Sequence, residues 1–366
     1  MRLYSLLVLS PSRSATLYPL MPEIYQRLKN HFFKIGSTYL KASSLHAKRP
    51  IQRIAFNQHL LTDSWGGANQ FLGQLASFLV ERGFEVTYEL DPLVTHIFIL
   101  DVRPIVTCTF TIEEAENFKK QFPHVKVIHR VNNCDQKYTA EELKLPGVGV
   151  DRQVIEMAKW VDQSIFISEW LRDYFELKGF PKEISRPVIT NAADDRCFYP
   201  QLKGWSSNEP LKIVTHHWSD NWLKGYKVYQ EIDEMIASGE LSGFELTVIG
   251  RWPKEIRWAS TTLGPKQGID LANELRKHHL YVTASQSEPG GMHFIEGMQC
   301  GLPVVFQKNG GGICEVARIA GIEFDTDVKT ALLQAREQYA ELREKVLRDA
   351  PSGKRLCEAF YKVIAG

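Results

Sequence analysis

The sequence lacks the signatures of several common protein classes. Its 366 residues include six cysteines, and none of them form a Cys-x-x-Cys pair. This spacing argues against a zinc site or a disulfide framework and fits a reducing compartment such as the cytosol. No apolar run approaches the roughly 20 residues that a membrane-spanning helix needs. We therefore expect a cytoplasmic protein whose short apolar start, residues 1–10, is not cleaved.

The chain also lacks an excess of charge of either sign. It carries 44 basic and 43 acidic residues, for a net charge of +1. Bulk electrostatics therefore give no reason to expect nucleic acid as a partner, and any phosphate site must be local. No Gly-x-Gly-x-x-Gly follows the first predicted strand, which argues against a dehydrogenase-type dinucleotide site.

Residues 1–50 differ from the rest of the chain. They carry eight basic residues against one acid, Glu23, with aromatic and aliphatic residues interleaved. One interpretation is an extension that contacts a membrane surface or a partner. The other is a solvated basic leader that packs on the domain behind it.

From residue 53 onwards, short apolar runs alternate with segments of helical periodicity. Strands are predicted at 53–57, 85–89, 96–100, 126–129, 164–168 and 187–190, with helices between them. Such alternation favours a mostly parallel sheet covered by helices on both faces. A polar linker at 201–210 ends this half.

The same pattern then restarts. Strands are predicted at 211–215, 245–249, 280–284, 304–306 and 321–324, and residues 328–365 read as helical. We predict an α/β fold with a basic extension (1–50), a Rossmann-like first domain (51–200), a Rossmann-like second domain (201–345) and a C-terminal helix (346–366) that crosses back to the first. Ligands of such folds bind at the carboxyl ends of the strands, here in a cleft between the two sheets.

The most informative stretch is residues 285–305, in which a strand runs into a glycine-containing loop and then a helix. Glu288 precedes Gly290 and Gly291, the helix starts near Met292 or His293, and Glu296 follows Glu288 with seven residues between them. Glycines let a ligand approach the backbone, and the first N–H groups of a helix favour a diphosphate. Glu288 can then reach a sugar, and Glu296 can bind ribose hydroxyls.

Other short motifs accompany this stretch in a fixed order. They are Gly66-Gly67, the run Asn191 to Asp194 followed by Phe198-Tyr199-Pro200, Lys224-Gly225, Gly250, and Gly311-Gly312 with Glu315. Together they resemble the retaining glycosyltransferase family 4 (group 1), with its Glu-x7-Glu signature, over roughly residues 53–320. The resemblance implies the GT-B fold, in which two Rossmann-like domains face a central cleft.

The resemblance also implies roles for individual residues. Glu288, Lys224 and His129 would be catalytic: Glu288 and His129 lie near the transferred sugar, and Lys224 neutralises the leaving diphosphate. The implied donor-binding residues are Gly66, Gly67, Asn191, Gly250, Arg251, Gly290, Gly291, Met292 and Glu296. The reaction would move a sugar from a nucleoside-diphosphate sugar to a hydroxyl of a glycan, glycolipid or small molecule, without a cofactor or metal.

The sequence departs from the family at one charged position. The family has an arginine about five residues before its phosphate lysine, whereas residues 216–223 contain none. Arg251 or the pair His216-His217 is a candidate substitute, although a buried aromatic cluster explains the histidines equally well. The departure motivates the alternative of a non-catalytic nucleotide-sugar-binding or scaffold protein on the same fold. Asp325-Thr326-Asp327 matches a metal-binding Asp-x-Asp but stands too near the C-terminus for that role.

Overall fold

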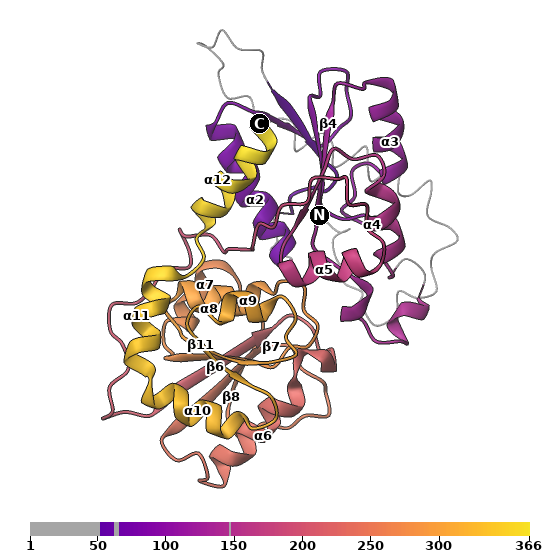
Figure 1. The fold of residues 1–366 in the computed structure, drawn as a ribbon. Coiled ribbons are helices and arrows are strands. Elements are labelled where there is room, and N and C mark those ends of the chain that lie inside the picture. The colour runs from indigo at the N-terminus through magenta and orange to yellow at the C-terminus, as the bar shows by residue number, and fades with distance from the viewer. Residues whose placement is uncertain (1–51, 62–65, 146–147) are drawn as a thin grey trace, which may run out of the picture. The chain divides into compact units, whose positions relative to one another are not determined.

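The chain folds around two separate parallel β-sheets. The computed structural model describes residues 52–61, 66–145 and 148–366 (Figure 1). The first sheet has five strands in the order β2-β1-β3-β4-β5, and the second has six in the order β11-β10-β9-β6-β7-β8. Every strand pair in both sheets is parallel. The predicted α/β fold class is therefore confirmed. The basic extension, residues 1–50, lies outside the described residues.

The first half alternates strands and helices as predicted. Its elements are β1 (Arg53–Phe56), α2 (Gly66–Glu81), β2 (Glu85–Thr87), β3 (His96–Ile99), α3 (Ile112–Gln121), β4 (Lys126–Val131), α4 (Asp151–Met157), β5 (Gln163–Phe166) and α5 (Glu169–Leu177). Helix α3 shows why these boundaries form, because Thr111 and Glu114 make a reciprocal capping box at its start.

The second half repeats the alternation. Its elements are β6 (Leu211–His217), α6 (Tyr226–Ala237), β7 (Phe244–Gly250), β8 (Thr261–Leu263), α7 (Gly268–Leu275), β9 (Leu280–Thr283), α8 (Met292–Gln299), β10 (Val304–Gln307), α9 (Ile313–Ala317), β11 (Gly321–Phe324), α10 (Val328–Glu337), α11 (Tyr339–Asp349) and α12 (Gly353–Ala365). Among the described residues, none of these helices combines the length and apolarity needed to cross a bilayer.

Both sheets are buried on both faces, which explains their near-continuous apolar strands. In β3, Ile97 and Ile99 face one hydrophobic cluster with α3, α4 and α5, while Phe98 between them faces another with α2 and α12. In β6, Ile213 and Val214 likewise face opposite clusters. Alternate side chains of each strand thus anchor a helix layer on either side.

Two predicted elements differ in the structure. Residues 187–190 do not form a strand, because only the isolated bridges Gln163↔Ser185 and Phe166↔Val188 join this segment to β5. The helical segment 328–365 is three helices, of which the last begins after Pro351. There Ser352 caps α12 by accepting from the Arg355 backbone N–H at 3.4 Å. Pro351 cannot supply a helical N–H, so the chain turns at this point.

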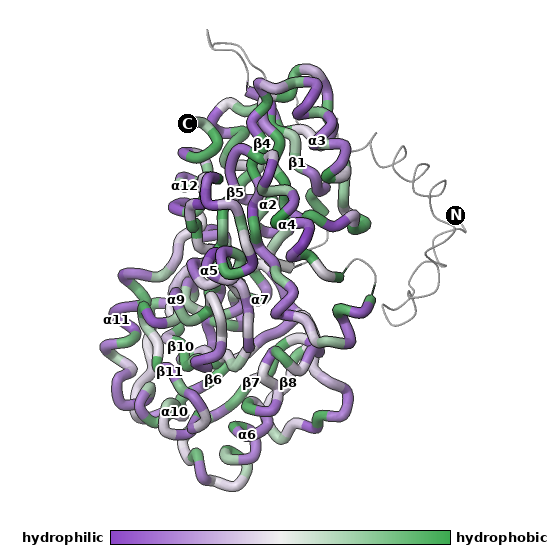
Figure 2. Tube along the Cα trace, turned by 45° about the vertical axis from the view of Figure 1, so that its right-hand side comes forward, coloured by the Kyte–Doolittle hydropathy of each residue, from purple (hydrophilic) through white to green (hydrophobic). Residues whose placement is uncertain are grey.

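Helix α12 packs on α2 of the first half, although it follows the whole second half in sequence. Leu356, Phe360 and Ile364 share a buried cluster with Ile54 and Phe71, and the Phe360 and Phe71 ring centroids lie 4.9 Å apart. Figure 2 shows α12 alternating between hydrophilic and hydrophobic colours along its turns. This amphipathic pattern lets the helix cover the first sheet with one face only.

We predict that Phe360→Ala lowers the free energy of unfolding by about 3–5 kcal/mol, because a fully buried aromatic ring leaves a cavity in the first half. Urea denaturation followed by circular dichroism measures the change. Lys362→Ala, at an exposed position of the same helix, is the matched control. An equally small effect of both substitutions would contradict the docking of α12.

Candidate functional site

The loop between β9 and α8 forms the centre of the candidate site. The helix begins at Met292, as predicted, and Gly291 precedes it without any side-chain cap. Ser287 has φ of 50°, the one positive value among non-glycine residues of the described chain. A left-handed serine is an uncommon conformation that neighbouring contacts must hold in place.

Those contacts come first from the loop after β10. Ser287 N–H donates to Asn309 O at 2.9 Å, Glu288 N–H donates to Gly310 O at 3.1 Å, and Gly312 N–H donates to Glu288 O at 2.9 Å. Gly311, with φ of 72°, lies so close that a Cβ there would fall 2.8 Å from Glu288 O. The Gly-Gly-x-x-Glu segment is therefore the backbone support of Glu288.

Glu288 and Lys224 form an ion pair at this loop. Lys224 ends a 3-10 turn (Trp222–Lys224) after β6, and Gly225 packs with φ of 89° against Ala284. Burial raises the pKa of Glu288, but the positive groups around it, Lys224 first and then Lys137, together outweigh burial and lower this pKa to about 2. The carboxylate is therefore ionised at neutral pH. Its contribution to stability is complete above the ordinary pKa of 4.5 and is lost progressively as the pH falls from there through the folded-state pKa of about 2.

Glu296 lies one turn into α8 and is almost fully buried, with 3% of its surface exposed. Its Oε2 lies 2.8 Å from Nε2 of His216, which is on β6. Ribose binding by Glu296 stays a prediction, and it requires the carboxylate to share or exchange this histidine partner. The Glu-x7-Glu spacing thus places one glutamate beside a lysine and the other beside a histidine.

The second histidine of the pair belongs to a buried aromatic cluster. The His217 ring stacks on Tyr229, with ring centroids 5.5 Å apart, and its Nε2 lies 2.9 Å from the Tyr229 hydroxyl. Burial, with the nearby His293 and Lys224 charges, places the pKa of His217 well below its usual value. His217 is therefore neutral at pH 7 and is not a cationic substitute for the missing arginine.

Gly250 and Arg251 lie at the end of β7. Gly250 has φ of 110° and faces the backbone of His217, so a side chain there would overlap the carbonyl of His217. Arg251 is exposed, and its Nη1 donates to the carbonyl of Trp218 at 3.2 Å. Its guanidinium thus stays at the surface beside the β6–α6 loop. Donor binding by both residues stays a prediction.

The first half contributes residues at the start of α2 and the end of β4. Gly66 and Gly67 open α2, and the Met292 side chain occupies the space where a Cβ of Gly67 would lie. His129 is buried near the end of β4, and its Nδ1 has no partner among the described residues. Burial, and then the charge of Arg130, lower the pKa of His129 to about 3. The imidazole of His129 is therefore neutral at pH 7.

Two hydrogen bonds from the first half hold the glycine loop directly. Asn191 Nδ2 donates to Gly290 O at 2.7 Å, and Ser168 Oγ donates to Pro289 O at 2.6 Å. The loop is thus supported by backbone of the second half and side chains of the first. The role of Ser168 was not visible in the sequence, because it depends on a contact 121 residues away.

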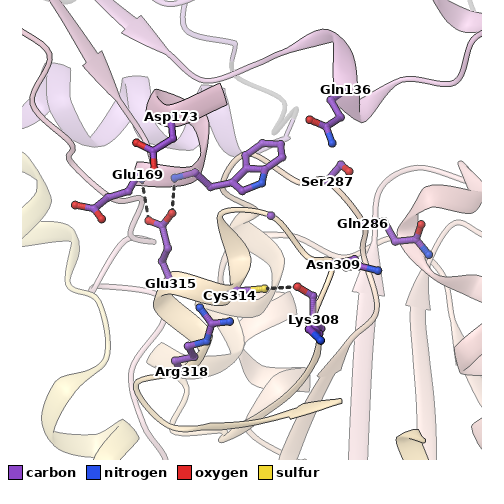
Figure 3. Close-up of a pocket in the computed structure, with 12 residues that line it drawn as sticks. Gln136, Glu169, Asp173, Gln286, Ser287, Lys308, Asn309, Cys314, Glu315 and Arg318 are labelled. Atoms are coloured by element: carbon purple, nitrogen blue, oxygen red, sulfur yellow. Dashed lines mark hydrogen bonds between the residues drawn. The ribbon is translucent and has the colours of Figure 1, made fainter. Parts of the chain in front are cut away.

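Glu315 supplies a third connection, through the start of helix α5. Its carboxylate oxygens accept from the backbone N–H groups of Glu169 at 2.9 Å and Trp170 at 2.6 Å (Figure 3). Ser168 Oγ accepts the next N–H, that of Leu171, at 3.1 Å. These N–H groups have no partner within α5, so Glu315 caps a helix of the first half from the second.

A polar cavity of about 620 Å³ adjoins this connection. Gln286 and Ser287 line it from the glycine loop, Lys308 and Asn309 from the loop after β10, and Gln136 from the loop between β4 and α4 (Figure 3). Another residue of the β4–α4 loop, Glu142, accepts from Asn221 Nδ2 at 3.2 Å. The loop between β4 and α4 therefore lies against the second half.

The described residues contain no group of three or more His, Cys, Asp or Glu side chains that could hold a metal ion. In the Asp-Thr-Asp triplet, Asp327 caps α10 by accepting from Thr330 N–H at 2.9 Å. The carboxylate of Asp325 lies 3.4 Å from Nζ of Lys308. Both acids thus have structural partners.

We predict that Glu315→Ala speeds hydrogen exchange at the amides of Glu169 and Trp170, because both lose their acceptor. The loss of such a cap costs about 0.5–2 kcal/mol of stability. Exchange measured by NMR tests this, with the exposed Glu344→Ala as control. Unchanged protection of the two amides would show that Glu315 does not couple the halves.

Comparisons with known proteins agree with this architecture. Residues 255–362 match the family model of Glycosyl transferases group 1. An uncharacterized glycosyltransferase of Methanocaldococcus jannaschii is 29% identical over 121 residues, which cover 33% of this chain and 27% of that protein. The chain thus aligns with about a quarter of its curated relative.

Several solved structures share the fold over 86% of this chain. The sucrose-phosphate synthase of Thermosynechococcus elongatus matches over 98% of its chain with a TM-score of 0.61 and 16% identity. HepE of Anabaena, in complex with UDP and glucose, matches over all of its chain with a TM-score of 0.61 and 14% identity. WaaG, a glycosyltransferase involved in lipopolysaccharide biosynthesis, also matches over its whole chain, with a TM-score of 0.58 and 12% identity.

At these identities the structural matches concern the fold, and the family match concerns the part of the chain that contains α8 and its glycine loop. The structural matches thus support the GT-B fold, and the family match shows that residues 255–362 are similar to Glycosyl transferases group 1.

Proposed function

We propose that this protein transfers a sugar from a nucleoside-diphosphate sugar to an acceptor hydroxyl, with retention of stereochemistry and without a metal. The observation that carries the proposal is the Lys224–Glu288 pair beside the uncapped start of α8. A cation, glycine backbone and a helix N-terminus together suit a diphosphate, and the neighbouring carboxylate suits sugar hydroxyls. The solved HepE structures, which contain UDP, glucose or UDP-glucose, support the same donor class.

Lys224 has the central electrostatic role in the proposed reaction. In the absence of donor, its ammonium group is paired with Glu288. A bound diphosphate would draw Lys224 to the bridging and terminal phosphate oxygens, which become more negative as the bond to the sugar breaks. Because this stabilisation grows towards the transition state, it accelerates the transfer itself. Glu288 is then released to accept hydrogen bonds from the sugar.

The acceptor is proposed to enter from the first half. Its hydroxyl loses a proton as it bonds to the anomeric carbon, and the departing diphosphate is the base that receives this proton on the same face. The loop between β4 and α4 and the cavity beside Ser287 give the acceptor a polar entrance. Amide and carboxylate side chains there suit the hydroxyls of a glycan, whether free or carried on a lipid.

We predict that the wild-type protein is stabilised by one of UDP, GDP and ADP, with or without EDTA, and that Lys224→Ala weakens binding of that diphosphate far more than of its nucleoside. Loss of a hydrogen bond between charged groups costs about 1.5–3 kcal/mol, or roughly tenfold to a hundredfold in affinity. Thermal shift identifies the base, and calorimetry gives the affinities.

Lys227→Ala is the matched control, since Lys227 is an exposed lysine in the first turn of α6, three residues after Lys224. Equal losses for nucleoside and diphosphate would remove Lys224 from the phosphate site. Diphosphate binding without any turnover of the matching nucleotide sugars would favour the non-catalytic alternative instead.

A further inference from the structure

Arg130 is a buried cation with unused donors. The residue is 3% exposed, and its Nη2 donates to Asn191 Oδ1 at 2.8 Å. Its Nε and Nη1 are buried and have no partner in the described structure. The guanidinium carbon lies 4.0 Å from the centroid of the Phe71 ring. No carboxylate of the described residues forms an ion pair with it, so its charge is balanced only by an amide oxygen and an aromatic face.

Another buried arginine shows what a purely structural role looks like in this protein. Arg343 is 7% exposed, and its two terminal nitrogens donate to backbone carbonyls, Nη1 to Gly301 O at 3.1 Å and Nη2 to Gln201 O at 2.8 Å. Buried polar groups in folded proteins are nearly always paired, and an unpaired buried charge is costly. Arg130 therefore requires an explanation that Arg343 does not.

The position of Arg130 points to its missing partner. It lies near the carboxyl end of β4, on the face that carries Phe71 from the early turns of α2. Asn191, which accepts from Arg130, donates its own amide to Gly290 O in the glycine loop at 2.7 Å. One side chain thus separates the guanidinium from the loop proposed to hold the diphosphate.

The charges of the site favour the same partner. A donor diphosphate carries more than one negative charge, whereas Lys224 supplies one positive charge. The arginine that the family places before its phosphate lysine is absent, His217 is neutral, and Arg251 donates to a surface carbonyl. The first half brings two cations near the glycine loop: Lys137, whose charge acts on Glu288, and Arg130, which reaches the back of the loop through Asn191.

We propose that Arg130 is a first-half ligand of the donor diphosphate and takes the place of the absent second-half arginine. This inference rests on the proposed function. The Nε–H and Nη1–H groups of Arg130 have no partner in the described structure, and each can donate a hydrogen bond to a phosphate oxygen. Both nitrogens are covered in this structure, so donor binding must displace the side chains above them. Arg130 then couples the two halves through one ligand.

The test compares Arg130→Gln, Arg130→Lys and wild type for binding of UDP, GDP or ADP and of the matching nucleoside by calorimetry. Glutamine keeps a donor for Asn191 but removes the charge, whereas lysine keeps the charge. We expect Arg130→Gln to weaken diphosphate binding by about tenfold or more with little change for the nucleoside. Arg130→Lys should retain part of the preference for the diphosphate over the nucleoside. Arg343→Gln is the control, and its ratio of diphosphate to nucleoside affinity should equal that of wild type.

If Arg130→Gln keeps the wild-type ratio of diphosphate to nucleoside affinity, the guanidinium only supports the fold and the inference is wrong. If the wild type binds no nucleoside diphosphate, the proposed function is wrong, and the inference about Arg130 falls with it. Should Arg130→Gln not fold, ¹⁵N-arginine NMR of the wild type decides the matter. The Nε–H signal of Arg130 is identified by its absence from the spectrum of Arg130→Lys. This signal should shift on addition of the diphosphate but not of the nucleoside, and an unshifted signal would overturn the proposal.

Discussion

The hydrogen bonds that hold the loop between β9 and α8 are the contacts on which the rest of the candidate site depends. This loop has no regular structure of its own and includes Ser287 in a left-handed conformation. It is fixed by backbone from the loop after β10 and by side chains of Ser168 and Asn191 from the first half. Because Glu288 lies within this loop, the position of its carboxylate depends on contacts from both halves of the protein.

This arrangement links binding to the contact between the two halves. The same segment that supports Glu288 through Gly311 also carries Glu315, which caps α5 of the first half. The glycine loop and the start of α5 are therefore supported by the same segment, residues 309–315. The pair Lys224–Glu288 gives the site its charge balance before a donor arrives, since Lys224 donates to Glu288 and lowers the pKa of that carboxylate.

Local patterns in the sequence were sufficient for most of the fold. Buried strands such as His96–Ile99 and the capping box at Thr111 are encoded by adjacent residues, so periodicity and capping rules find them. The start of α8 at Met292 and the glycines before it were predicted for the same reason. Residues 187–190 have an apolar strand-like sequence, but they meet β5 only through isolated bridges, which the local pattern does not reveal.

The contacts that sequence reasoning missed join residues that are far apart in the chain. Glu315 caps a helix 145 residues earlier, and the short edge strand β8 has too few apolar residues to give a signal. The unpaired state of Arg130 becomes visible only when every neighbouring acceptor is known. Glu296 was predicted to bind ribose hydroxyls, but its buried partner His216 was not foreseen, because it comes from β6, 80 residues away.

The proposed nucleoside-diphosphate sugar binds between the glycine loop and the β6–α6 turn. Hydrogen–deuterium exchange with and without the stabilising nucleoside diphosphate tests this site. We expect slower exchange in residues 285–299 and 222–225, with no change in α10, which lies elsewhere on the second half. Protection confined to other segments, or no protection by any nucleoside diphosphate, would show that the donor does not bind here.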